Sequence, residues 1–143
     1  MKIYILRHCE SVHNANNRSG TNCPLTEKGI LQAKNISGHF DVVICSPLLR
    51  AIQTLKNSKI TYDKLHTSHL CREICKDTGD FLEHEDITYR EPESKLKHRA
   101  NKFKNELNKY NENKKILVVT HYHFIYHMTG LHLKNGELFE YTF

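Results

Sequence analysis

The chain has 143 residues, a formal net charge of +5 with its eleven histidines neutral, 38% hydrophobic residues and 26% charged residues. This length fits a single domain of residues 1–143 with a sizeable core, and the composition excludes wholesale disorder. No apolar run approaches the ~20 residues that a membrane-spanning helix needs, and no cleavable signal pattern is found, so we expect a cytoplasmic protein without a membrane partner. The positive charge favours an anionic ligand, whether a phosphate ester, a nucleic acid or an acidic lipid.

Apolar and amphipathic segments alternate along the first half of the chain. Residues 2–6 and 41–45 form short, β-branched or apolar runs with the length expected of buried parallel strands. Between them, residues 26–33 begin with a threonine and an acidic first turn, which indicates a capped helix. A second helix is predicted over residues 46–55, where Ser46 would be the N-cap and a proline the first helical residue.

The second half of the chain continues this alternation. The pattern weakens over residues 71–92, where acidic residues gather, and we expect this stretch to be a loop over the functional site. The other predicted elements are a strand within residues 59–70, a helix over 93–111, a strand over 115–120, a helix over 121–131 and an edge strand over 136–143. Such alternation predicts an α/β fold, a three-layer α/β/α sandwich with a mostly parallel sheet.

Four basic side chains stand where predicted strands end. Arg7 and His8 follow the first strand, Arg50 lies shortly after the second, and His121 directly follows the strand that ends at Thr120. Ligands of open α/β sheets bind just outside the carboxyl ends of the strands. Guanidinium forks bind phosphate oxygens bidentately and stay charged at any working pH. The arrangement therefore predicts that the four side chains converge on a phosphate group.

Three other kinds of site fit the sequence less well. Cys45 and Arg50 are separated by four residues, one fewer than a cysteine-dependent phosphatase needs. The five cysteines are expected to be reduced thiols, and the Cys-x3-Cys pair that begins at Cys71 has no second pair at a zinc-site spacing. His123 and His127 would share a helix face, but no nearby carboxylate completes a metal site, so a histidine-rich helix beside an anion site is the simpler interpretation.

Several blocks of the sequence, in order along the chain, resemble the histidine phosphatase superfamily, also called the phosphoglycerate mutase-like superfamily. They cover almost the whole chain. The first resembles the Arg-His-Gly-Glu motif, two others resemble the second arginine and second histidine motifs, and Glu73 stands where the family carries an acidic residue. The blocks are residues 6–11 with Asn14, residues 24–33, residues 45–54, residues 71–73 and residues 118–121.

The resemblance implies a metal-independent phosphatase that forms a phosphohistidine on His8 and needs no cofactor. Arg7 and Arg50 would bind the transferring phosphate, and His121 would donate a further hydrogen bond to it. Glu73 would protonate the leaving group and later activate water, with its pKa raised by the phosphate dianion.

Other residues have supporting or alternative roles in this interpretation. Asp77, Asp80 and Glu83 are further candidate acids, and Asn14 and Ser11 are candidate phosphate or substrate contacts. The substrate would be a phosphorylated small molecule or a phosphoprotein, and a nucleic-acid partner is not expected. The sequence leaves the physiological substrate and the oligomeric state open.

The chain departs from the family pattern at three places. Cys9 replaces the glycine that normally follows the nucleophilic histidine, so we expect slower or redox-sensitive activity. Tyr122 and His123 follow the second histidine motif where smaller residues are common, and they could narrow the pocket or contact the substrate. The intervals around Glu73 are short, which predicts reduced lid insertions and a relatively open pocket. A phosphoglycerate mutase-type phosphotransferase, a phosphate-binding pseudoenzyme and a nucleic-acid-binding module are the alternatives.

Overall fold

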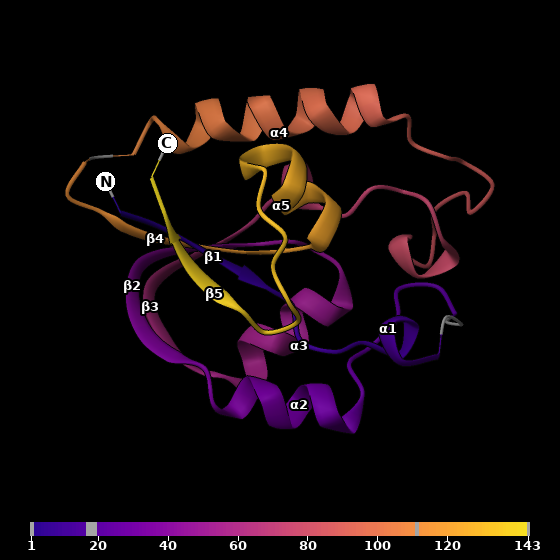
Figure 1. The fold of residues 1–143 in the computed structure, drawn as a ribbon, viewed down its shortest axis with the longest axis horizontal. Coiled ribbons are helices and arrows are strands. Elements are labelled where there is room, and N and C mark those ends of the chain that lie inside the picture. Colours follow the sequence, from indigo (N-terminus) through magenta and orange to yellow (C-terminus); the bar gives the residue numbers. More distant parts are fainter. Residues whose placement is uncertain (1, 17–19, 111, 143) are drawn as a thin grey trace.

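Five strands form one sheet in the order β3-β2-β4-β1-β5 in a computed structural model that describes residues 2–16, 20–110 and 112–142 (Figure 1). β1 to β4 are parallel, and β5 pairs antiparallel with β1. The strands are β1 Lys2–Arg7, β2 Ser37–Cys45, β3 Lys59–Thr67, β4 Lys115–Thr120 and β5 Leu138–Tyr141. The predicted mostly parallel sheet is confirmed, with its antiparallel strand at one edge.

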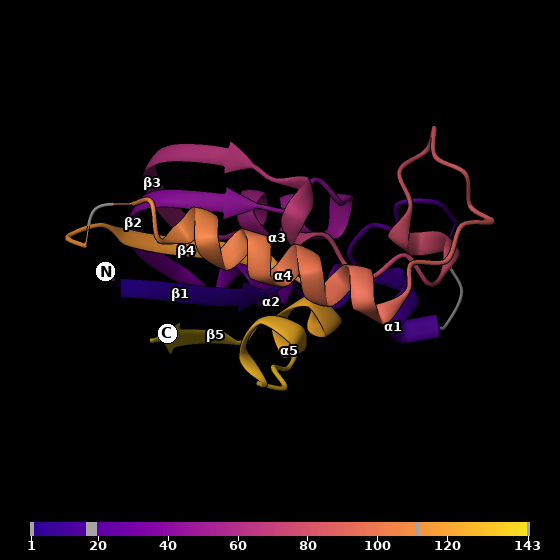
Figure 2. The same ribbon diagram turned by 90° about the horizontal axis from the view of Figure 1, so that it is seen from above.

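Helices cover both faces of this sheet. α2 and α3 lie on one face and α4 and α5 on the other, as Figures 1 and 2 show from two directions. The helices are α1 Val12–Asn16, α2 Glu27–Lys34, α3 Leu49–Asn57, α4 Glu93–Leu107 and α5 Tyr122–Thr129. The predicted three-layer α/β/α sandwich is therefore confirmed. No helix in the described part of the chain is both long and apolar enough to cross a membrane.

A separate hydrophobic core fills each side of the sheet. On one side, Ile5 belongs to a buried cluster with Phe103 of α4 and Phe124 of α5, whose rings meet edge to face with centroids 5.5 Å apart. On the other side, Leu6 belongs to a buried cluster with Ala51 of α3. Successive strand residues point to opposite faces, so the apolar run of β1 supplies both cores.

Two element boundaries differ from the sequence-based predictions. α3 begins at Leu49 rather than near Ser46, and the serine hydroxyl instead accepts a hydrogen bond from the Leu48 backbone N–H at 3.2 Å. The serine therefore caps a turn before the helix. β2 begins at Ser37, earlier than predicted, because residues 37–40 pair with β3. Such long-range pairing leaves no local sequence signal.

Two other predicted boundaries concern the ends of elements. α4 ends at Leu107, before the predicted end at Asn111, which lies outside the described residues, as does Phe143 at the end of the predicted edge strand. The predicted loop over residues 71–92 contains no α-helix or strand among its residues, all of which are described, and its one complete helical turn is the 3-10 turn Thr78–Asp80.

Candidate active site

The carboxyl ends of three neighbouring strands bring the predicted basic residues together. Arg7 at the end of β1 pairs in register with Thr120 at the end of β4, and the His8 backbone N–H donates to the Thr120 carbonyl at 3.0 Å. The rings of His8 and His121 consequently lie with their centroids 5.0 Å apart. Arg50 reaches the same place from the first turn of α3, and its charge acts on both histidines.

The ring of His8 is held in one tautomer. Its Nδ1 lies 2.7 Å from the Cys9 carbonyl oxygen, which can only accept a hydrogen bond, so Nδ1 carries the proton and Nε2 keeps its lone pair. Burial lowers the pKa of His8 well below its usual value, and the charges of Arg50 and Arg7 lower it further. His8 is therefore a neutral imidazole with Nε2 ready to attack an electrophile.

His121 is a second buried, neutral histidine. Burial lowers its pKa well below the usual value, and the charge of Arg50 adds to this effect. Its Nε2 lies 2.8 Å from the Ser46 hydroxyl, whereas its buried Nδ1 has no hydrogen-bond partner among the described residues. Ser46 was predicted only as a helix cap, and the structure shows that it orients His121.

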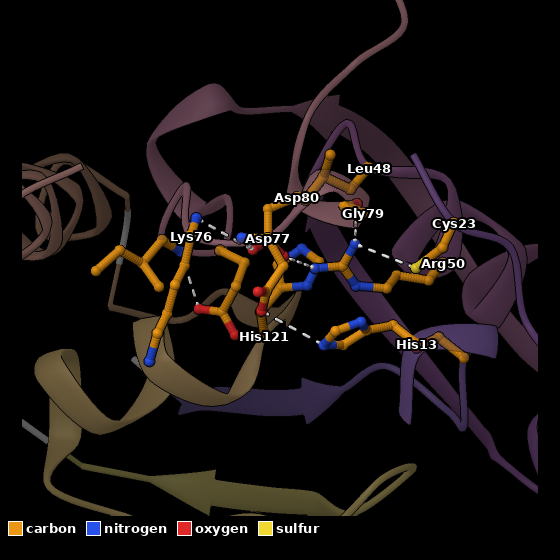
Figure 3. Close-up of polar contacts among 12 residues, drawn as sticks. His13, Cys23, Leu48, Arg50, Lys76, Asp77, Gly79, Asp80 and His121 are labelled. Carbon is orange, nitrogen blue, oxygen red and sulfur yellow. Dashed lines mark hydrogen bonds and ion pairs between the residues drawn. The ribbon is translucent and has the colours of Figure 1, made fainter. Parts of the chain in front are cut away.

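The two arginines of the site have different partners. The Arg7 guanidinium donates from Nη1 to the Leu133 carbonyl at 3.0 Å, lies 5.0 Å from the centroid of the Tyr122 ring, and has a buried Nε without a partner among the described residues. Arg50 instead donates from Nη2 to the carboxylate of Asp80 and from Nη1 to the Gly79 carbonyl, each at 2.8 Å. Figure 3 shows Arg50 in contact with this segment.

Glu73 belongs to the segment 71–92, and its carboxylate lies beside the start of α5, where it accepts hydrogen bonds from backbone N–H groups. Oε1 accepts from the N–H groups of Ile74 at 3.0 Å and Phe124 at 3.2 Å, and Oε2 accepts from the His123 N–H at 3.1 Å and its Nδ1 at 3.2 Å. Burial by itself raises the pKa of Glu73, but the His123 hydrogen bond and charge outweigh it, so the pKa is lowered. The predicted rise thus needs a bound phosphate.

The two weaker candidates, Ser11 and Asn14, bond to each other at the edge of the site. The Ser11 hydroxyl donates to the Asn14 side-chain oxygen at 2.9 Å, and the Asn135 amide donates to the same oxygen at 3.2 Å. Asn135 also donates to the His8 carbonyl at 3.1 Å. Asn135 thereby connects Asn14 of α1 with the backbone of His8, directly after β1.

The three alternative acids lie in different places. Asp80 binds Arg50, and Asp77 lies 3.4 Å from Nε2 of His13. Glu83 is elsewhere, where its carboxylate accepts from the side-chain amide of Asn22 at 3.2 Å. Only Asp77 and Asp80 therefore belong to the site.

Most of the predicted site residues line a cavity of about 150 Å³, whereas His121 is fully buried behind it. The lining consists of Arg7, His8, Ser11, His13, Asn14, Arg50, Glu73, Ile74, Lys76, Asp77, Asp80, Tyr122 and His123. The pocket is small, and Arg50 and His8 are only 5% and 3% exposed. Residues between Ile74 and Asp80, together with Tyr122 and His123, line this small pocket, and the expectation that it is relatively open stays a prediction.

Cys9 lies beneath the pocket rather than in it. Its side chain is buried against Leu25 and Ala33, and burial raises the pKa of its thiol to about 11. A Cβ added to Gly136 would lie 3.3 Å from the sulfur, so the glycine leaves the space that the thiol fills. The expected redox sensitivity is therefore not supported, because a buried, protonated thiol reacts poorly.

Arg99 of α4 supports Glu73 and was not predicted as a site residue. Its guanidinium donates to the carbonyl oxygens of Leu70, Arg72 and Glu73, at 2.7, 3.0 and 3.3 Å, and binds the Glu91 carboxylate through Nε and Nη2, each at 2.8 Å. The sequence offered no local signal, since Arg99 sits in a lysine-rich helix that resembles a solvated surface.

The predicted metal alternative has no support in the described part of the chain. No group of three or more His, Cys, Asp or Glu side chains is positioned there to hold a metal ion. His123 binds Glu73 instead, and the ring of His127 lies against Tyr126, with centroids 5.5 Å apart.

Comparison with known proteins places this chain in a family. The model of the histidine phosphatase superfamily (branch 1) matches residues 3–93. The alpha-ribazole phosphatase of Shigella flexneri has a similar structure, with a TM-score of 0.74, 21% identity and coverage of 96% of this chain and 88% of that one. A phosphoserine phosphatase of Entamoeba histolytica, solved with 3-phosphoglyceric acid, has a TM-score of 0.72 and 22% identity, with coverage of 99% of this chain and 90% of that one. A Mycobacterium tuberculosis protein has a TM-score of 0.75 and 18% identity, with coverage of 99% of this chain and 91% of that one. At these identities, the similar structures show the fold.

Proposed function

The chain belongs to the histidine phosphatase superfamily, and we propose that it hydrolyses phosphomonoesters, without a metal ion, through a phosphohistidine on His8. The observation that carries the proposal is the state of His8: buried, neutral, held by Nδ1, and influenced by the positive charges of Arg7 and Arg50. A neutral imidazole that shares a cavity with two guanidinium groups suits attack on a phosphoryl group, whose negative oxygens need cations around them.

The proposed reaction has two steps. Nε2 of His8 attacks phosphorus, the bond from phosphorus to the ester oxygen breaks, and the departing oxygen takes a proton from the Glu73 carboxyl group. Water then attacks the phosphohistidine, gives a proton to the Glu73 carboxylate, and the bond between phosphorus and nitrogen breaks. His8 returns to its starting state, so no other reactant is consumed.

Glu73 needs a proton before the first step. In the free protein its pKa is lowered, but a phosphate dianion beside the carboxylate would raise it. The bond to Nδ1 of His123, whose pKa this contact raises, offers a route for that proton. Arg7, Arg50 and His121 would hold the transferring group, and the unpartnered Nε of Arg7 and Nδ1 of His121 support this assignment.

We further propose a small phosphorylated metabolite or a phosphorylated protein side chain as the substrate, and a cytoplasmic location. The cavity has room for a phosphate and a few attached atoms, so the rest of the substrate would lie over its mouth. All five cysteines are free thiols, as expected in a reducing compartment.

Hydrolysis of a panel of phosphate esters in the presence of EDTA, by wild type and by His8→Ala, tests the proposal. Wild type should turn over and acquire an acid-labile phosphoryl label, whereas His8→Ala should lose on the order of 10⁴-fold in kcat, as enzymes do without their nucleophile. His98→Ala, which removes an exposed histidine of α4, is the matched control and should behave as wild type.

Other results would point to the alternatives. Unchanged turnover in His8→Ala would contradict the mechanism. Phosphate binding by wild type without labelling would identify a pseudoenzyme. Transfer of the label to a second phosphate acceptor faster than to water would identify a mutase-type phosphotransferase.

A further inference from the structure

One phosphate-binding arginine of the proposed mechanism already holds an anion from its own chain. Nη2 of Arg50 donates to Oδ1 of Asp80 at 2.8 Å, and the two side chains are only 6% and 9% exposed. Nη1 donates to the Gly79 carbonyl and lies 3.8 Å from the sulfur of Cys23. Both terminal nitrogens therefore have partners, and Figure 3 shows Arg50 with Asp80, Gly79 and Cys23 around the end of its side chain.

The Asp80 carboxylate is held in place by the backbone as well. Its Oδ2 accepts hydrogen bonds from the backbone N–H groups of Asp77 at 2.8 Å and Lys76 at 3.2 Å. In addition, Nη2 of Arg72 donates to the backbone carbonyl oxygen of Asp80 at 3.0 Å. A carboxylate that binds one guanidinium and two backbone N–H groups uses the same donors that a phosphate oxygen would use. The Asp80 carboxylate therefore binds the Arg50 guanidinium in the way that a phosphate oxygen of a ligand would.

Arg7 shows that this occupation is particular to Arg50. No carboxylate pairs with Arg7 among the described residues, and its hydrogen bond to the Leu133 carbonyl leaves Nε unpartnered. A phosphate that bridges the two arginines would meet free donors on Arg7 and the Asp80 carboxylate on Arg50. Two anions in contact in a buried pocket repel strongly, because the local dielectric constant is low.

We propose that the Asp80 carboxylate competes with the substrate phosphate for Arg50, and that Asp80 thereby sets how tightly the site binds phosphate. The inference rests on the part of the proposed function that assigns Arg50 to the phosphate. It does not depend on the chemistry at His8. A dianion that binds Arg50 must displace Asp80, meet it in the protonated form, or lie beside its charged carboxylate on the remaining N–H groups of the guanidinium, and each of these weakens binding.

Competition of this kind depends on pH. Burial raises the pKa of Asp80, the Arg50 charge and the backbone bonds oppose this, and the charge of Glu73 adds to the rise. As the pH falls through that pKa, Asp80 loses its charge and stops competing, so anion binding becomes tighter. The other charged or titratable side chains around it are His13, Arg50, Arg72, Glu73, Lys76, Asp77 and His123. A variant of Asp80 alone keeps all of these and isolates its contribution.

Calorimetric titration with sulfate tests the proposal. Sulfate keeps its two charges from pH 5 to pH 8, so any pH dependence belongs to the protein. At pH 8, Asp80→Asn should bind sulfate at least about tenfold more tightly than wild type, the factor that corresponds to one pK unit of interaction. At pH 5 the gap should narrow, because wild type gains affinity as Asp80 is protonated and the variant has no such group.

Asp86→Asn is the matched control. It removes the same charge from the same segment, residues 71–92, but the Asp86 side chain is exposed, lies outside the cavity lining and accepts hydrogen bonds from Thr88 rather than from Arg50. Its sulfate affinity should stay within about threefold of wild type, since exposed charges are screened. Thermal unfolding of each variant shows whether it is folded. If Asp80→Asn is not folded, Asp80→Ser replaces it in the same titrations, because it removes the same charge and keeps a polar side chain.

Equal or weaker binding by folded Asp80→Asn would overturn the proposal, and weaker binding would show that Asp80 orients Arg50. An affinity of wild type that does not change with pH would also overturn it. Tighter binding without hydrolysis of any ester would leave this inference standing and remove the phosphatase. Ester hydrolysis with a phosphoryl label on His8, but no increase in the sulfate affinity of Asp80→Asn, would support the phosphatase and overturn this inference. Failure of every protein to bind sulfate would contradict the assignment of Arg50 and this inference together.

Discussion

One side of the pocket is the edge of the sheet, where Arg7, His8 and His121 stand at strand ends, and the other side is the covering segment, residues 71–92. The sheet side is held by ladders of backbone hydrogen bonds. The covering segment has no such ladder and is held by side chains that bind backbone carbonyls, above all those of Arg99 and Arg72.

This difference predicts that the two sides of the pocket have different roles: the sheet side carries out catalysis, and the covering segment modifies it. Residues on the sheet side are held in fixed positions, because moving them would disrupt the hydrophobic core. They include the proposed catalytic residues, so their substitution should remove catalysis. Residues of the covering segment contact the site through a few side-chain bonds, so their substitution should change affinity, proton supply or stability. The following substitutions test this division, from the largest expected effect to the smallest.

Arg7→Ala should lower kcat/KM by about 10³-fold, because it removes a charged donor that would stabilise the developing charge of the transferring phosphoryl group. Steady-state kinetics with a phosphate ester measure this loss. Arg90→Ala, an exposed arginine of the covering segment, should leave kcat/KM within about threefold, since a screened surface charge contributes little. A similar loss in both variants would erase the distinction between the two sides.

Glu73→Gln should lower kcat by about 10²-fold for esters with poor leaving groups and much less for esters whose leaving group departs without a proton. This split reports proton supply, which a purely structural role would not produce. The same measurement across leaving-group pKa values in wild type provides the reference. Equal losses for all esters would mean that Glu73 only caps the start of α5 through the N–H groups of His123 and Phe124.

Arg99→Lys should lower the free energy of unfolding by about 2–3 kcal/mol, because lysine keeps the charge but lacks the fork that reaches Glu91 and several carbonyl groups. Denaturant unfolding measures this change. Lys97→Arg, an exposed change on the same helix, should have an effect within about 0.5 kcal/mol. An unchanged stability of Arg99→Lys would show that the covering segment is held by other contacts.

Cys9→Ala should cost about 1 kcal/mol of stability through a small buried cavity and leave kcat/KM within about twofold. The thiol lies outside the pocket lining and its pKa is raised to about 11, so alkylating reagents at pH 8 should modify it more slowly than Cys75, which is partly exposed. Mass spectrometry of the alkylated protein measures both rates. Rapid inactivation linked to modification of Cys9 would place its sulfur in the pocket after all.

The Glu73–His123 pair should give a small, pH-dependent contribution to stability. The pKa of Glu73 is lowered and that of His123 is raised. The contribution is therefore complete between the unfolded values, roughly pH 4.3 to 6.5. It is lost as the pH rises through the raised pKa of His123 or falls through the lowered pKa of Glu73.

Since His123 is about half exposed, the pair should be worth below about 1 kcal/mol. Chemical unfolding of wild type and His123→Gln at pH 5.5 and pH 9 measures it. A difference between the two proteins that grows at pH 9 would contradict the assigned signs.

The sheet and the residues at its strand ends could be predicted because their signals are local. The β-branched run that ends at Thr120 predicts a buried strand, and His121 follows it directly, so the fold class places the histidine at the edge of the sheet. The position of Ser46 could not be derived in the same way. Its sequence context suits a helix cap, and only the approach of His121 from a distant strand turns it into a partner of the site.

By itself, the sequence determined the alternation of strands and helices, the three-layer architecture and the convergence of Arg7, His8, Arg50 and His121, since period, β-branching and strand order act through local rules. Only the tertiary structure decided that Asp80 binds Arg50, that Glu73 caps α5 and that Cys9 lies beneath the pocket. Those contacts join side chains far apart in the chain. Their partners are chosen by the path of the covering segment, which no regular hydrogen-bond ladder imposes.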